Sequence, residues 1–162
     1  MTSAESRNLL LTLVEFRMRR KGTHETPMDR GLQGDLGWQP RLQFAALRAM
    51  KECVIAVPAL EMARKVLGIG NCSGRDVDKF KRFGLAPVPA QCVAPPLVAE
   101  CFANLECKVV DTRLVNTFNI FILEVVKAWT DPAQKHPKTI HHHGYGRFCV
   151  DGEMIKLKSR MP

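Results

Sequence analysis

The sequence predicts a mainly β fold with short helices, and its simplest form is a small antiparallel barrel with helical insertions. Two observations support this class. Short runs rich in β-branched and apolar residues are typical of strands, and between them lie short segments with apolar residues at helical spacing. The expected strands are 53–57, 105–111, 119–129, 146–150 and 154–157. A turn at Asp151–Gly152 is expected to join the last two.

The helical segments are short and carry their own stop signals. The expected helices are 44–51, 60–67 and 75–83. Gly68 and Gly70 are expected to stop the second helix, because glycine is a poor residue for a helix interior. Gly84 follows the third helix and readily adopts the left-handed conformation of a helix C-terminus. Short helices placed between strands therefore fit the barrel class.

The strand patterns also predict which positions are buried. Segment 105–111 alternates with period two, so one of its faces should be buried. Segment 119–129 is apolar throughout, and we expect it to lie away from an exposed sheet edge. The Pro-rich segment 85–96 is expected to be an extended connector. A loop is expected to carry His136 and the run His141–His143.

Length and composition are those of one globular domain. With 162 residues, of which 46% are hydrophobic and 25% charged, the chain can bury a substantial core. No apolar run in the sequence approaches the roughly 20 residues that span a bilayer. The first residues also lack the positive flank of a secretory signal. We therefore expect a cytoplasmic protein with no membrane partner.

The formal net charge is +8, which favours polyanionic partners in general. The cations are scattered along the chain, aromatic residues make up only 7%, and the sequence contains no nucleic-acid-binding motif. Nucleic acid is therefore not an expected partner. Cofactors that carry phosphate account for the charge equally well.

Neither the cysteines nor the histidines form a recognisable metal site in the sequence. The six cysteines include no CxxC pair and no zinc-ligand spacing, and a disulfide framework is not expected. The side chains of His141–His143 should point to alternating sides of an extended segment, and no acidic or cysteine ligand completes a set. No serine and histidine form a triad pattern. We expect no metal ligand and no catalytic side chain.

The segment Gly70–Phe80 is the strongest candidate site in the sequence. Ser73 and Asp76 have the spacing of a helix start, where a hydroxyl and a carboxylate satisfy free backbone N–H groups. Arg75 and Lys79 are four residues apart and would share one helix face. Free N–H groups and two cations at a helix start can bind a phosphate. An ordinary capped helix with a solvated basic face fits the same residues, so both interpretations stay open.

Several ordered segments resemble the flavin reductase-like, FMN-binding split-barrel family. The segments are Glu52–Pro58, Glu61–Ala63, Gly70–Phe80, Ala99–Cys107, Gly144–Gly146 and Val150–Glu153. The resemblance covers residues 44–162. It implies a split β-barrel that is usually a homodimer, with FMN bound near the subunit interface.

The resemblance also implies which residues face the cofactor. In the family, the loop and helix start matching 71–79 border the FMN phosphate, and Lys79 is the strongest candidate. Arg48 and Lys51 could reach the same anion or could lie on a solvated helix face. Phe148 could stack near the isoalloxazine or pack in the core. The expected cofactor-binding set is Asn71, Ser73, Gly74, Arg75, Lys79, Arg48, Lys51 and Phe148.

The resemblance leaves the electron donor and acceptor open. Many flavin reductases of this fold carry a Gly-Asp-His segment whose histidine contacts nicotinamide, but the matching residues 117–121 lack it. This argues against direct reduction by NAD(P)H and favours the flavoredoxin-like branch, which passes electrons to protein or small acceptors. We expect an FMN-binding oxidoreductase. The alternatives are a non-catalytic fragment that dimerises or binds phosphate compounds, and a basic module that binds nucleic acid or metal.

Residues 1–43 do not match the family, which places its opening barrel strands there. Residues 34–43 can be encoded so that a reading one base later gives Val-Ile-Ser-Ala-Gly-Asn-Arg-Asp-Phe-Ser. Family members carry a similar strand and turn before the segment that starts at Phe44. One hypothesis is a frameshift before Phe44, and a genuinely divergent N-terminus is the alternative. In either case we expect poor order before Phe44, exposed sheet edges and weakened flavin binding.

Overall fold

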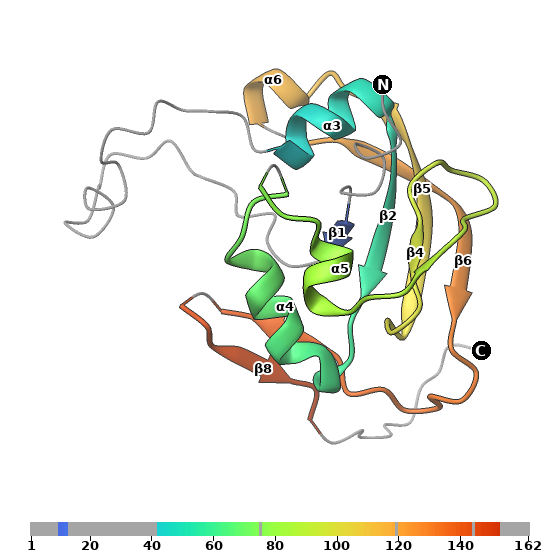
Figure 1. The fold of residues 1–162 in the computed structure, drawn as a ribbon. Helices are drawn as coiled ribbons and strands as arrows, with labels where there is room; N and C mark the ends of the chain where they lie inside the picture. Colours follow the sequence, from blue (N-terminus) through green and yellow to red (C-terminus); the bar gives the residue numbers. More distant parts are fainter. Residues whose placement is uncertain (1–9, 13–41, 75, 119, 144, 153–162) are drawn as a thin grey trace, which may run out of the picture.

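A four-stranded sheet organises the chain in the computed structural model, which describes residues 10–12, 42–74, 76–118, 120–143 and 145–152. Its strands are β1 (Leu10–Thr12), β2 (Glu52–Val57), β5 (Ala103–Asp111) and β6 (Ile122–Thr130). They lie in the order β1–β2–β5–β6 (Figure 1). β1 runs parallel to β2, and the other two pairs are antiparallel.

Two small sheets and five short helices complete the described part. The small sheets pair β3 (Pro87–Val88) with β4 (Leu97–Val98), and β7 (Ile140–His142) with β8 (Phe148–Val150). The helices are α3 (Leu42–Met50), η1 (Leu60–Met62), α4 (Ala63–Gly70), α5 (Lys79–Phe83) and α6 (Val115–Phe118). Within the described ranges, no helix is long and apolar enough to cross a membrane. The mainly β prediction with short helices is confirmed.

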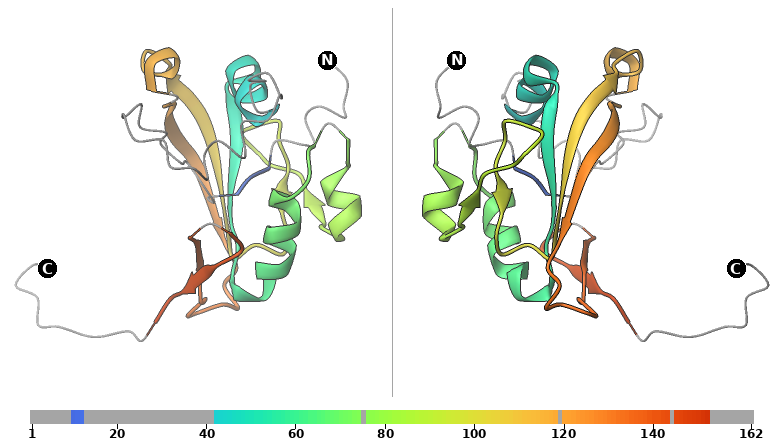
Figure 2. Two further views of the ribbon diagram at one scale, coloured as in Figure 1. Left: turned by 90° about the vertical axis from the view of Figure 1, so that its left-hand side faces the viewer. Right: turned by 90° about the vertical axis from the view of Figure 1, so that its right-hand side faces the viewer.

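The helices divide the core into two main parts. Figure 1 shows α3 and α6 at one end of the sheet, and Figure 2 shows α4 and α5 on one side of it. One cluster packs beneath α4 and α5 and includes Met62, Val66, Ile69, Phe80 and Ile140. The other packs beneath α3 and α6 and includes Leu47, Cys53, Cys107, Val115 and Phe121. Several cysteines therefore act as small core residues, as free thiols do in apolar surroundings.

The Pro-rich connector is fixed to the sheet by a buried carboxylate. Glu106 of β5 is fully buried and accepts hydrogen bonds from the backbone N–H of Cys92 (2.5 Å) and the Nε1–H of Trp129 (2.6 Å). Burial alone would raise the pKa of Glu106, but these hydrogen bonds outweigh it and hold the pKa below its ordinary value. The predicted extended connector is thus held against the sheet by hydrogen bonds from its backbone to the Glu106 carboxylate.

The helix predicted at 75–83 begins later than expected. α5 starts at Lys79, because the side chain of Asp78 accepts a hydrogen bond from the Lys81 N–H (3.2 Å) and caps it. Ser73 and Asp76 instead form a turn, in which the Asp76 N–H donates to the Ser73 carbonyl (3.3 Å). The predicted cap is therefore wrong. The left-handed C-cap predicted at Gly84 is confirmed, with φ of 57°.

The prediction that Gly68 stops the second helix is also wrong. α4 continues through Gly68 and ends after Gly70. A Cβ atom at position 68 would lie 2.5 Å from Cε1 of Phe83. This glycine therefore permits α4 and α5 to pack closely, and its role is steric rather than that of a helix stop.

Two predictions about the last strands need correction. β6 is an edge strand of the described sheet, with Ile122 42% exposed and Val125 52% exposed, although its apolar sequence predicted an interior position. β8 pairs with β7, so His141 and His142 lie in a strand rather than a loop. The predicted partner strand 154–157 and the predicted poor order before 44 fall largely outside the described residues.

Candidate functional site

The strongest candidate site in the sequence lies between the end of α4 and the start of α5. We call residues 71–79 the α4–α5 corner. α4 ends here, and the Asn71 N–H makes its last hydrogen bonds, to the carbonyls of Leu67 (3.1 Å) and Gly68 (3.2 Å). Asn71 and Ser73 are exposed, and Gly74 is half-buried. Arg75, another predicted site residue, lies outside the described residues. The structure thus places three of the predicted polar or small residues together on one exposed turn.

Lys79 has an unexpected position within this corner. Its side chain is only 7% exposed, and its Nζ donates to the Ile69 carbonyl at 2.8 Å. Cys72 Sγ approaches the same carbonyl at 3.7 Å. Burial lowers the pKa of Lys79, and the nearby Cys72 opposes this shift. Because Ile69 is in the last turn of α4, the ammonium caps the negative end of that helix.

Arg48 and Lys51 form a separate pair of exposed cations where α3 leads into β2. Lys51 has φ of 56°, a left-handed conformation at the helix end. Its N–H donates to the Leu47 carbonyl, and its own carbonyl accepts from Val109, both at 2.9 Å. In the described part of the chain, no hydrogen bond or ion pair joins either side chain to the α4–α5 corner.

The sequence left two positions open for Phe148, near the isoalloxazine or in the core, and in the structure its side chain packs against the core. It is half-buried in β8 and packs against the cluster beneath α4 and α5. Its ring lies 4.9 Å from that of His142, centroid to centroid, with the planes tilted by 41°. A hollow of about 260 Å³ lies beside α5, and its lining residues are Asp78, Phe80, Lys81, Gly84, Leu85 and Pro87. Of the predicted cofactor-binding residues that the structure describes, none lines this hollow.

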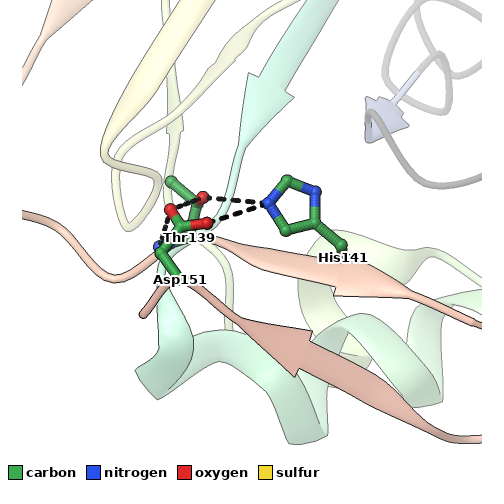
Figure 3. Close-up of polar contacts among 3 residues, drawn as sticks. All are labelled: Thr139, His141 and Asp151. Atoms are coloured by element: carbon green, nitrogen blue, oxygen red, sulfur yellow. Dashed lines mark hydrogen bonds and ion pairs between the residues drawn. The ribbon is translucent and has the colours of Figure 1, made fainter. Parts of the chain in front are cut away.

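Sequence reasoning missed a polar cluster on the β7–β8 hairpin. Figure 3 shows Thr139, His141 and Asp151 with their side chains directed toward one another. His141 Nε2 lies 3.0 Å from Asp151 Oδ1, and the Thr139 N–H donates to Asp151 Oδ2 at 3.2 Å. The Thr139 hydroxyl donates to the same carboxylate. The His141–His143 run was visible in the sequence, but the pairing of β7 with β8 was not predicted.

Comparison with known proteins identifies the family. Residues 37–149 match the model of the flavin reductase like domain. The chain belongs to this family. The match begins before Phe44 and ends before the C-terminal segment, so its bounds differ slightly from those expected from the sequence. The predicted resemblance is confirmed.

Solved structures show the same fold. The FMN-binding domain of a flavin reductases-like enzyme from Shewanella baltica has a TM-score of 0.66 and 24% identity, covering 74% of this chain and 70% of that one. Flavoredoxin of Desulfovibrio vulgaris has a TM-score of 0.67 and 21% identity, covering 76% and 71%. The split-barrel fold class is thus confirmed, although the sheets formed by the described residues do not close into a complete barrel.

Two curated relatives that the chain matches are described as uncharacterized proteins. One, from Archaeoglobus fulgidus, is 34% identical over 92 residues, which is 55% of this chain and 52% of the relative. Another, from Pyrococcus abyssi, is 36% identical over 86 residues, which is 53% of this chain and 49% of the relative. The chain thus spans about half the length of the curated relatives it matches.

Proposed function

We propose that this chain binds FMN and takes part in electron transfer as a flavin reductase-like or flavoredoxin-like protein. The observation that carries the proposal is the family match over residues 37–149. Two solved structures that share the fold are described as an FMN-binding domain and as a flavoredoxin. When bound, the flavin supplies the hydride and electron chemistry, and the protein contributes binding, orientation and shielding from water.

The α4–α5 corner is the proposed seat of the FMN phosphate. An exposed turn with small residues lets a ligand approach the backbone closely, and Asn71 and Ser73 offer polar side chains there. We include Gly74 and Arg75 in this seat. Lys79 fits the role only in part, because its Nζ is bonded to the Ile69 carbonyl. It supplies positive charge from beneath the turn, and direct contact with a phosphate would require this bond to be exchanged.

Arg48 and Lys51 are proposed as outer cations that attract the same anion. Both are exposed, so they act mainly through long-range attraction, which salt screens. Phe148 is proposed to support the isoalloxazine side of the site from beneath, since its ring is half-buried against the core. The proposed electron transfer requires an electron donor, such as NAD(P)H, and a protein or small molecule that accepts the electrons.

We propose further that the chain acts as a homodimer. Large apolar side chains are exposed at the end of β5, in and just before α6, and in β6, with exposed fractions from 41% to 60%. They are Val110, Leu114, Phe118, Ile122 and Val125. Exposed apolar surface on neighbouring elements commonly contributes to protein interfaces. A non-catalytic fragment that dimerises or binds phosphate compounds is the second candidate, because the sheets formed by the described residues do not close into a complete barrel.

FMN titration, followed by quenching of flavin fluorescence, tests the proposal. Ser73→Asp places a negative charge in the proposed phosphate seat and should weaken FMN binding roughly tenfold through like-charge repulsion. Thr130→Asp makes the same charge change at an exposed position at the end of β6, outside the proposed interface, and should leave the affinity unchanged. Equal affinities for the two variants would remove the corner from the site. Absence of any quenching by the unmodified chain would overturn FMN binding itself and favour the second candidate.

A further inference from the structure

One face of the β7–β8 hairpin collects a group of residues whose chemistry the proposed function does not use. His141 is the register partner of Cys149. Hydrogen bonds join Asp151 N–H to the Thr139 carbonyl (3.1 Å) and His143 N–H to the Arg147 carbonyl (2.8 Å). These flanking bonds make His141 and Cys149 a hydrogen-bonded pair, whose Cα atoms in such ladders lie about 5.5 Å apart.

Cross-strand partners project from the same face of a sheet, so the Cys149 thiol and the His141 imidazole share a surface. Asp151 and Thr139 belong to that face too, as their side-chain contacts show (Figure 3). Arg147 lies two residues before Cys149 and therefore projects from the same side. Both Cys149 and Arg147 are exposed, so a reagent in solution can reach the thiol.

The Asp151 carboxylate fixes the orientation of the His141 ring. A carboxylate only accepts hydrogen bonds, so the 3.0 Å contact requires a proton on His141 Nε2. In the neutral ring this leaves Nδ1 with a lone pair that can accept a proton. The hydrogen bonds from Thr139, followed by that from His141, lower the pKa of Asp151, so this carboxylate stays charged near neutral pH.

We propose that Cys149 is a reactive thiol whose proton is taken by His141 Nδ1, with Asp151 as the positioning residue, and that it forms mixed disulfides with small-molecule disulfides. A thiol, an imidazole base and an orienting carboxylate are the three parts that activate cysteine nucleophiles in general. Arg147 adds a cation to the same face. The proposal does not depend on flavin binding.

The chemistry balances without an external electron source. The Cys149 Sγ proton moves to His141 Nδ1, and the thiolate attacks one sulfur of the disulfide reagent. A new S–S bond to Cys149 forms as the S–S bond of the reagent breaks. The leaving thiolate takes the proton from the imidazolium, so one disulfide is consumed and one is formed.

The other cysteines provide a contrast within the same chain. Cys53, Cys101 and Cys107 are buried, and burial raises the pKa of Cys53 and of Cys101 to about 12. Such thiols are inert toward disulfides in the folded protein. Cys92 is exposed, as Cys149 is, but it lies in the Pro-rich connector rather than on the hairpin face. It is therefore the matched control.

The test measures second-order rates at pH 7 with an aromatic disulfide whose released thiolate absorbs visible light. The Cys72→Ser/Cys92→Ser chain reports on Cys149, and the Cys72→Ser/Cys149→Ser chain reports on Cys92. We expect Cys149 to react about tenfold faster than Cys92, since a free thiol is only a few per cent thiolate at this pH. Adding His141→Gln should remove that advantage and leave the Cys92 rate unchanged.

Asp151→Asn supplies a second readout that a purely structural role would not produce. It should raise the pH at which the Cys149 rate reaches half its maximum, with no change in the profile of Cys92. The inference is overturned if Cys149 reacts no faster than Cys92, or if His141→Gln slows both thiols or neither. Thermal melting of each variant confirms that the rates refer to the folded chain.

Discussion

The α4–α5 corner and the β7–β8 hairpin face differ in how their side chains are held, although both lie at ends of short elements. In the corner, Lys79 is the strongest candidate for a phosphate-binding cation, but its side chain is buried. Its Nζ is bonded to a helix terminus, 2.8 Å from the Ile69 carbonyl. On the hairpin face the polar groups are exposed, and His141 keeps 62% of its side-chain surface open to solvent. The main cation of the corner is thus held by a buried bond, whereas the hairpin face presents exposed groups that are available to react.

This difference shows what a linear motif can and cannot predict. The segment 71–79 was found in the sequence because its residues are consecutive, but whether Lys79 faces solvent depends on how α4 meets α5. The hairpin face is made by residues from two strands, and only their register brings His141 opposite Cys149.

The largest expected effect concerns the segment before α3. If the residues before Phe44 are translated out of frame, which is one of the two hypotheses for this segment, restoring their frame should tighten FMN binding on the order of tenfold or more. The nucleotide sequence gives the first check: the shifted frame must spell a strand-like segment. An unchanged FMN affinity in the restored chain would show that the corner does not depend on that segment.

Replacing Lys79 tests whether its buried hydrogen bond to the Ile69 carbonyl stabilises the corner. Lys79→Met keeps the length of the side chain but leaves the Ile69 carbonyl without its charged donor, which should cost about 1–3 kcal/mol of unfolding free energy. Lys65→Met is the matched control, because Lys65 Nζ donates to the Gly84 carbonyl at a more exposed position (3.2 Å). Urea unfolding compares the two. A loss no larger than that of the control would show that the buried bond does not stabilise the corner.

The contact between α4 and α5 gives a somewhat smaller effect. Gly68→Ala should destabilise the fold by about 1–2 kcal/mol, since its Cβ would meet Phe83 Cε1 at 2.5 Å. At Gly70 an added Cβ meets nothing within 4 Å, so Gly70→Ala should be neutral or slightly stabilising. Thermal melting of the pair separates close packing from general glycine effects, and equal shifts for the two would contradict it.

The hairpin face should show the smallest stability effect. Asp151→Asn removes an exposed contact with His141, so its unfolding midpoint at pH 7 should equal that of the unmodified chain within error. Folding lowers the pKa of Asp151 below its ordinary value of 3.8. Any contribution of Asp151 to folding stability is therefore fully present at pH values above 3.8, and it is lost as the pH falls through the lower pKa of the folded state. A large loss of stability at pH 7 would show that this face is structural.

Much of the fold was predictable because it depends on local signals. β2 is a short apolar run ended by Pro58, and Gly84 gave the end of α5 correctly. The errors have a common origin in tertiary contacts. The sequence predicts a helix stop at Gly68, because the contact of this residue with Phe83 is not visible in the sequence. The apolar residues of β6 predict burial, although the strand lies at an edge of the described sheet.

The candidate site was predictable only as a segment. Asn71, Ser73 and Gly74 do lie together, yet Asp78 rather than Ser73 caps α5. Both side chains have capping chemistry, so the choice between them is made by the path of the chain after α4. Arg48 and Lys51 lie where α3 leads into β2, so they do not belong to this segment.

The affinity of the unmodified chain for FMN, compared with its affinity for riboflavin, tests the central claim most directly. The two ligands share the isoalloxazine and differ in the phosphate that the α4–α5 corner is proposed to hold. Charge-assisted hydrogen bonds to that group should make FMN bind at least roughly tenfold more tightly. Equal affinity for the two ligands would contradict the account.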